Sequence, residues 1–146
     1  MDQLNMALMM FDTRGILIPQ GAVATIEMIS SLEPDDGHTG AIGRLRSGGR
    51  EWPVFALDRN LAPIGEAAPT SKYCVAFDID GETAFALVCD EVSSMALAST
   101  DEINPLQACM RNAASPIEAM VMREGQLLLL SRVETMHRYL DVDVAA

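Results

Sequence analysis

The residues of this chain that could carry out catalysis do not stand at catalytic spacings. Its histidines, His38 and His137, lie far apart, and neither belongs to an H-E-x-x-H or H-x-x-x-H metal-binding motif. The sequence also lacks the G-x-S-x-G motif of serine hydrolases and the Walker and G-x-G-x-x-G motifs that hold nucleotide phosphates. We therefore predict a protein that is not an enzyme, with no catalytic residue, no cofactor and no metal.

Three polar clusters resemble ligand sites, but turns explain them better. The glycines of residues 40–49 lack the Lys-Ser or Lys-Thr that follows in a phosphate-binding loop. Residues 78–82 are acidic like a calcium loop but lack the other EF-hand positions. Asp90 and Glu91 are adjacent, so their side chains would diverge on a helical turn. We predict that Asp90 caps such a turn and that Glu91 is a surface acid, rather than a catalytic carboxylate pair.

The number and spacing of the cysteines indicate buried packing residues rather than disulfides, metal ligands or reactive thiols. Cys74, Cys89 and Cys109 are an odd number without C-x-x-C spacing, which favours neither a disulfide framework nor a zinc cluster. Cys74 and Cys89 both stand in apolar runs. We interpret these two as small buried hydrophobic residues rather than reactive thiols.

Charge and hydropathy limit the classes of partner. The formal net charge of −11 disfavours nucleic acid and anionic membrane surfaces, whose phosphates would be repelled. No apolar stretch approaches the roughly 20 residues of a membrane-spanning helix, so we expect no direct membrane insertion. The first residues contain an acid and no base, unlike a secretory signal, and we therefore expect a cytoplasmic protein.

The elements that would position a binding surface occur twice. Phe11-Asp12-Thr13-Arg14-Gly15 reappears as Phe77-Asp78-Ile79-Asp80-Gly81, each time between two apolar runs, which is typical of a β-hairpin. A short helical turn is expected after each hairpin, over 21–23 and 90–92, and then a further strand over 26–30 and 94–97.

A second hairpin also occurs in both halves. Aligned on Gly49 and Gly125, residues 41–55 and 119–130 predict strand, turn and strand, followed by short helices over 57–61 and 133–140. We predict one domain over 1–146, with repeat halves 1–61 and 72–140 joined by a Pro- and Gly-containing linker over 62–71. Short strands with regular turns favour small barrels over a parallel sheet.

With these elements in place, the sequence resembles the CheW-like domain family of bacterial chemosensory adaptors over nearly its whole length. Residues 86–92, Ala-Leu-Val-Cys-Asp-Glu-Val, resemble the family's G-L-L-V-D-E-V stretch, and residues 101–105 resemble the acidic-Ile-x-Pro segment after it. Residues 42–46, with Gly49 and 52–54, resemble its V-x-N-L-R-G-x-x-x-P-V-I-D-L run. Ile18-Pro19 and Val23 fit its first hairpin, I-P-x-x-x-V.

The resemblance implies a mainly β fold of two small five-stranded SH3-like barrels around a shared core, with short helices and a C-terminal helix. It also implies an adaptor of two-component signalling that couples methyl-accepting chemoreceptors to a CheA-type histidine kinase, in chemotaxis or type IV pilus control. The residues expected at partner contacts are Arg46 above all, with Leu45, Arg44, Val23, Asp90 and Glu91.

The chain departs from the family pattern within the second hairpin. Arg44 replaces an Asn, Ser47-Gly48 lengthen the turn, and Ala56 replaces an Asp. The alternative function is therefore a regulatory or interaction protein of this fold that has lost receptor–kinase coupling. The unique Trp52 is expected in the core rather than at a binding hot spot.

Charge is distributed unevenly between the two halves. Arg44, Arg46, Arg50 and Arg59 cluster in the first, whereas all charged residues of 77–103 are acidic. Ordinary solvation of loops explains this as well as an adaptor with oppositely charged faces, and both interpretations stay open.

Overall fold

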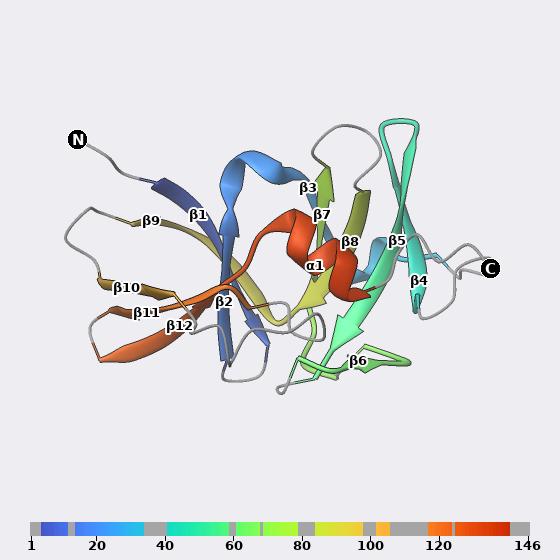
Figure 1. Cartoon of the computed structure of the whole chain (residues 1–146). Helices are drawn as coiled ribbons and strands as arrows, with labels where there is room; N and C mark the ends of the chain where they lie inside the picture. The colour runs from blue at the N-terminus through green and yellow to red at the C-terminus, as the bar shows by residue number, and fades with distance from the viewer. Residues whose placement is uncertain are drawn as a thin grey trace.

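The computed structural model describes residues 4–11, 14–33, 41–58, 61–67, 69–78, 84–97, 102–105, 117–123 and 125–140. His38, Arg59 and Cys109 lie outside these ranges. Two curled sheets lie side by side, and the helix α1 (Val133–Leu140) covers their junction (Figure 1). Among the described residues, no helix is both long and apolar enough to cross a membrane.

The first sheet has six strands. Their order is β10 (Glu102–Pro105), β11 (Ala119–Arg123), β12 (Gln126–Leu130), β2 (Arg14–Pro19), β1 (Leu4–Phe11) and β9 (Glu91–Leu97). All neighbours are antiparallel except β12 and β2, which are parallel.

The second sheet repeats this arrangement with other strands. Its order is β3 (Val23–Met28), β7 (Tyr73–Asp78), β8 (Ala84–Cys89), β5 (Arg50–Leu57) and β4 (Gly43–Ser47), with β6 (Pro63–Ile64) also paired to β5. Here β5 and β8 form the parallel pair. Short 3-10 turns, η1 (Gln20–Ala22) and η2 (Ile29–Ser31), flank β3.

Each sheet combines hairpins from both halves of the chain. The first hairpin, β1–β2, joins the last hairpin, β11–β12, and it also receives β9. The hairpin β7–β8 joins β4–β5 and receives β3. The second barrel is closed where Glu33 and Arg44 exchange backbone hydrogen bonds of 2.8 and 2.7 Å.

Three apolar clusters hold the sheets together. A shared core lies between the sheets and under α1, and it includes Met9, Ile16, Phe55, Phe77, Phe85, Leu129 and Met136. A second cluster fills the barrel of the second sheet around Trp52, and a third fills the first barrel around Leu17 and Val121. The predicted fold of two barrels around a shared core, with a C-terminal helix, is therefore confirmed.

The C-terminal helix follows the predicted periodicity. Val133, Met136 and Leu140 recur on one face and are buried in the shared core, which is the amphipathic pattern of a surface helix. The Tyr139 hydroxyl donates a hydrogen bond to the Leu61 carbonyl and so ties α1 to the chain that leaves β5.

Two local features differ from the sequence-based expectation. Each sheet carries one strand in addition to five, β10 or β6, and β6 lies within the predicted linker. The helix predicted over 57–61 is wrong: Leu57 ends β5, and Leu61 has a left-handed φ of 65°. The Asp58 carboxylate accepts the Ala62 N–H at 3.0 Å, and such Asx hydrogen bonds favour turns over helices.

Candidate protein-interaction surfaces

The β4–β5 hairpin carries most of the residues predicted at partner contacts. Gly48 and Gly49 have φ values of 59° and 80°, and a two-residue type I′ hairpin turn requires a positive φ at both central positions. On β4, Arg44 and Arg46 share the outer face, because strand residues two apart point the same way. The intervening Leu45 points inward and is fully buried.

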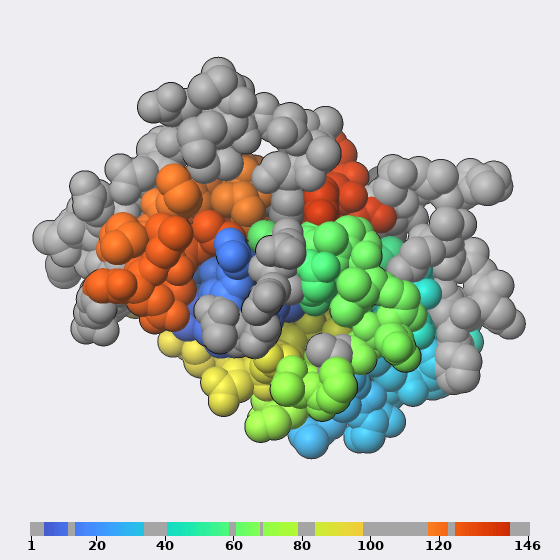
Figure 2. Space-filling view, turned by 90° about the horizontal axis from the view of Figure 1, so that it is seen from below, coloured from blue at the N-terminus to red at the C-terminus, as the bar shows by residue number. Residues whose placement is uncertain are grey.

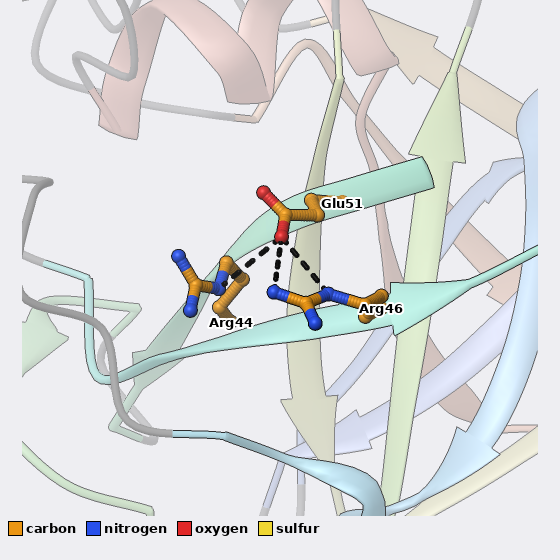
Figure 3. A network of polar contacts seen from close by, with 3 residues as sticks. All are labelled: Arg44, Arg46 and Glu51. Atoms are coloured by element: carbon orange, nitrogen blue, oxygen red, sulfur yellow. Dashed lines mark hydrogen bonds and ion pairs between the residues drawn. The ribbon is translucent and has the colours of Figure 1, made fainter. Parts of the chain in front are cut away.

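Glu51 joins the two arginines. Arg46 donates from Nε and Nη2 to Oε1 of Glu51, at 2.9 and 2.6 Å. The Nε of Arg44 lies 3.7 Å from the same oxygen, so all three contacts converge on one carboxylate oxygen (Figure 3). The hydrogen bond from Arg46 to Glu51, with the nearby charge of Glu33, raises the pKa of Arg46 above its ordinary value.

The tip of this hairpin is attached to the rest of the barrel on both sides. Arg50 forms an ion pair with Asp78 at the end of β7, and its guanidinium lies 5.2 Å from the centre of the Trp52 ring. The Ser47 hydroxyl donates to Glu27 of β3 at 3.4 Å. The Arg44–Glu51–Arg46 cluster therefore stands on a fixed hairpin rather than on a free loop.

Burial separates direct contact residues from supporting ones. Leu45 is 0% exposed and packs beside Trp52 inside the barrel, so a partner cannot reach its side chain, and we correct its assignment to a supporting role. Trp52 is 3% exposed, which confirms the core interpretation. The alternation of side chains along β4 predicts from the sequence alone that Leu45 points inward and is not a direct contact residue.

Val23 lies on a different surface, at the junction of the two sheets. It borders a hollow of about 270 Å³ between β3 and β9, together with Ala7, Gln20, Ile26, Val92, Ser93 and Ser94. The outer face of β3 continues this surface with exposed apolar side chains, because Ile26 is 47% and Met28 58% exposed. These two residues were not among the predicted contacts, although they alternate with Glu27 along the strand.

Asp90 and Glu91 lie near the other end of that surface, but not on a helical turn. The Asp90 N–H donates to the Met10 carbonyl at 2.8 Å, and Glu91 pairs with Met10 as the first residue of β9. The predicted helical turn and cap are therefore wrong, because pairing with β1 extends this segment. The Thr70 hydroxyl donates to Asp90 Oδ1 at 2.9 Å.

These acids border a second open hollow of about 370 Å³. Its other lining residues are Met10, Thr70 and Lys72. Figure 2 shows the start of β9 (yellow) beside the residues that precede β7 (green). Asp90 and Glu91 thus have a cation and a hydroxyl for neighbours, an arrangement that fits a polar contact surface.

Two described cysteines are buried and chemically protected. Desolvation raises the pKa of Cys74 and of Cys89 to about 12. A thiol must ionise to act as a nucleophile, so both behave as the buried hydrophobic residues that the sequence predicts. In the described ranges, no three His, Cys, Asp or Glu side chains gather at a position that could hold a metal ion.

The predicted contact residues thus fall on two separate surfaces. Arg44 and Arg46 stand on β4, where the Glu33–Arg44 bridge closes the second barrel, whereas Val23, Asp90 and Glu91 flank the β3–β9 junction. Glu51 was missed by the sequence analysis, although the register set by Gly48-Gly49 places it opposite Arg46.

Comparison with known proteins is informative at the level of structure. No protein-family model matches the chain, and no curated protein sequence matches it. Among solved structures, the scaffolding protein TtCheW from Thermoanaerobacter tengcongensis is similar, with a TM-score of 0.65, 13% identity and 89% of each chain covered. At this identity the likeness concerns the fold, and the chain has a CheW-like fold.

Proposed function

We propose that this protein is a non-catalytic adaptor that couples chemoreceptors to a CheA-type histidine kinase in a bacterial chemosensory system. The observation that carries the proposal is the CheW-like fold, shared over 89% of the chain with a scaffolding protein. Such an adaptor would work in the cytoplasm, where the kinase and the signalling ends of the receptors lie.

The arrangement of the surfaces supports this function. An adaptor must hold two proteins at once, so it needs contact surfaces that do not overlap. The β4–β5 hairpin is polar and fixed, whereas the β3–β9 junction offers a hollow and exposed apolar side chains. Two surfaces of different chemistry suit two different partners.

Co-purification tests the proposal. The wild-type protein should retain both the CheA-type kinase and a chemoreceptor of the same organism. Arg46→Glu should weaken one of these contacts and Ile26→Asp the other. Arg14→Glu is the matched control, since Arg14 is an exposed arginine on the first sheet. Failure of the wild type to retain either protein would refute the adaptor function.

A second function is favoured by the altered hairpin. Arg44 lies 3.7 Å from Glu51, and Ser47 donates a hydrogen bond to Glu27, so residues that depart from the family pattern contact neighbours of Arg46. Ala56 is 1% exposed, so its replacement of an Asp acts inside the barrel rather than on the surface. A protein that binds the kinase but leaves kinase activity insensitive to receptors would be a regulator of the same fold instead of a coupling adaptor.

A further inference from the structure

The chain crosses between the two sheets beside the hollows described above. It passes from the first sheet to the second at 19–23, between β2 and β3, and returns at 89–91, between β8 and β9. Gln20 of the first crossing lines the β3–β9 hollow, and Asp90 of the second lines the other hollow. The Ser94 hydroxyl of β9 donates to the Gln20 side chain at 2.7 Å. Short crossings of this kind can act as a hinge between two packed bodies.

The helix α1 connects the sheets on the opposite side of the molecule. Figure 2 shows α1 (red) and β9 (yellow) on opposite sides. The start of the helix is attached to the first sheet, because the Ser131 N–H donates to the Leu17 carbonyl of β2 at 2.9 Å. Glu118, which precedes β11, accepts a hydrogen bond from the Thr135 hydroxyl and forms an ion pair with Arg132 at 3.3 Å. The first turn of α1 therefore belongs to the first sheet.

The last turn of α1 is anchored to the second sheet. The Tyr139 hydroxyl donates to the Leu61 carbonyl, and the centre of the His137 ring lies 5.9 Å from that of Phe85 on β8. Burial and the nearby charge of Asp58 raise the pKa of Tyr139, so its hydroxyl keeps the proton that it donates. Leu61 has a φ of 65°, a conformation that costs free energy in a residue other than glycine. The chain keeps this strained turn at the point where the helix reaches the second sheet.

The shared core lies between α1 and the β3–β9 hollow. The apolar face of α1 is buried in this core. Val23 and Val92 pack against the same core, and both also line the hollow. Interiors packed this closely transmit the displacement of one element to the next. A shift of α1 would therefore change the shape of the hollow, although its described lining residues include none from α1.

We propose that α1 is a clasp that holds the two sheets together opposite the hinge formed by 19–23 and 89–91, and that the Tyr139–Leu61 hydrogen bond keeps the β3–β9 hollow in one shape. With this bond intact, the hollow is preorganised for a partner protein. Without it, the sheets move about the hinge, and only a fraction of the molecules has the binding shape. The clasp follows from contacts within the chain, and only its effect on partner binding rests on the adaptor function.

Hydrogen exchange of the free protein tests the clasp. Tyr139→Phe removes the hydroxyl and leaves the ring in the core. Amide exchange at the two crossings should rise about fivefold, the size of one hydrogen bond, while exchange in β4 and β5 stays unchanged. Arg138→Gln is the matched control, because Arg138 is the exposed neighbour of Tyr139 on the same helix.

Calorimetry tests the effect on binding, with the purified kinase and the receptor cytoplasmic fragment as probes. The protein whose binding Ile26→Asp weakens is the one that uses the β3–β9 surface. It should bind Tyr139→Phe about fivefold more weakly than wild type, for the same lost hydrogen bond. Arg138→Gln should bind it like wild type.

The outcomes separate the clasp from the adaptor function. Faster exchange confined to the crossings, with weaker binding at the β3–β9 surface, supports the proposal. Unchanged exchange at the crossings overturns the clasp, and an equal rise in every strand overturns it too, because Tyr139 would then only stabilise the fold. Faster exchange at the crossings with unchanged binding overturns the link to the hollow. Absence of wild-type binding to either protein overturns the adaptor function, and hydrogen exchange alone then decides the clasp.

Discussion

The hairpins β4–β5 and β11–β12 occupy equivalent places in the two sheets. Each lies next to a central hairpin through a parallel pair, β5–β8 or β12–β2, and each turns at a glycine with φ near 80°, Gly49 or Gly125. They lie at opposite ends of the molecule (Figures 1 and 2). Their backbones therefore present side chains in the same way.

Their surfaces differ at one matched cross-strand pair. Arg46 lies opposite Glu51 in the first hairpin, and Met122 lies opposite Leu127 in the second. All four side chains are close to half exposed. The comparison teaches that the backbone sets where a pair is displayed, whereas the side chains decide what that pair can bind.

The largest effect should come from the buried position next to each pair. Trp52 and Leu128 occupy matched sites inside their barrels and are 3% and 2% exposed. Trp52→Ala should lower the free energy of unfolding by about 3–5 kcal/mol, and Leu128→Ala by about 2–5 kcal/mol, because each leaves a cavity. Urea denaturation measures both. Equal losses below about 1 kcal/mol would show that the barrels are not closely packed.

Alkaline pH should weaken the second sheet, because both described thiols lie there. The folded-state pKa of Cys74 and Cys89 is about 12, above the ordinary 9.0. Unfolding then releases protons above pH 9, so this stability is complete below pH 9 and is lost as the pH rises toward 12. Denaturation of wild type and Cys74→Ala/Cys89→Ala between pH 8 and about 11 measures it. If the free energy of unfolding of both proteins falls equally with pH, the two buried thiols are not the cause of the alkaline loss of stability.

A smaller loss of stability should follow from removing the contacts of Arg50 at the tip of the β4–β5 hairpin. Arg50 pairs with Asp78 and lies over Trp52, whereas the matched residue of the other hairpin is Gln126. Arg50→Gln should lower the free energy of unfolding by about 1 kcal/mol, the combined size of a partly exposed ion pair and a cation–π contact. Hydrogen exchange of the β4 and β5 amides should rise more than that of β11 and β12.

The smallest effect on stability should come from replacing the exposed apolar pair of the β11–β12 hairpin with a charged pair like that of β4–β5. Met122→Arg/Leu127→Glu places the charged pair on the second hairpin, and both positions are exposed. The free energy of unfolding should change by less than about 0.5 kcal/mol, as for other exposed positions. Binding to the kinase or receptor should change if the apolar pair is itself a contact. A large loss of stability would show that Met122 and Leu127 belong to the core.

Much of the fold could be predicted from local patterns. Each hairpin has its own signature in the sequence, namely apolar runs around a turn with glycine, and α1 has its own periodicity. The pairing of β1 with β9 and of β2 with β12 could not be predicted from composition or periodicity, because residues far apart in the chain form it. The same long-range pairing converts residues 91–97 into one continuous strand.

The candidate site was predictable in part. Strand alternation predicts that Arg46 is exposed. The register of the two-glycine turn predicts that Glu51 lies opposite it, so the Arg46–Glu51 pair could have been predicted from the sequence. The interior position of Leu45 follows from the same alternation. The neighbours of Asp90 come from Thr70 and Met10 in other segments, and no local pattern contains them.

The exchange of strands between the two halves of the chain has a consequence for folding. The second sheet takes all its strands from residues 23–89, whereas the first sheet is incomplete until β12 pairs with β2. Contacts between residues so distant in sequence make folding slow and cooperative. The β4–β5 surface therefore belongs to the sheet whose strands are synthesised first, whereas the β3–β9 junction also needs β9 from the other sheet.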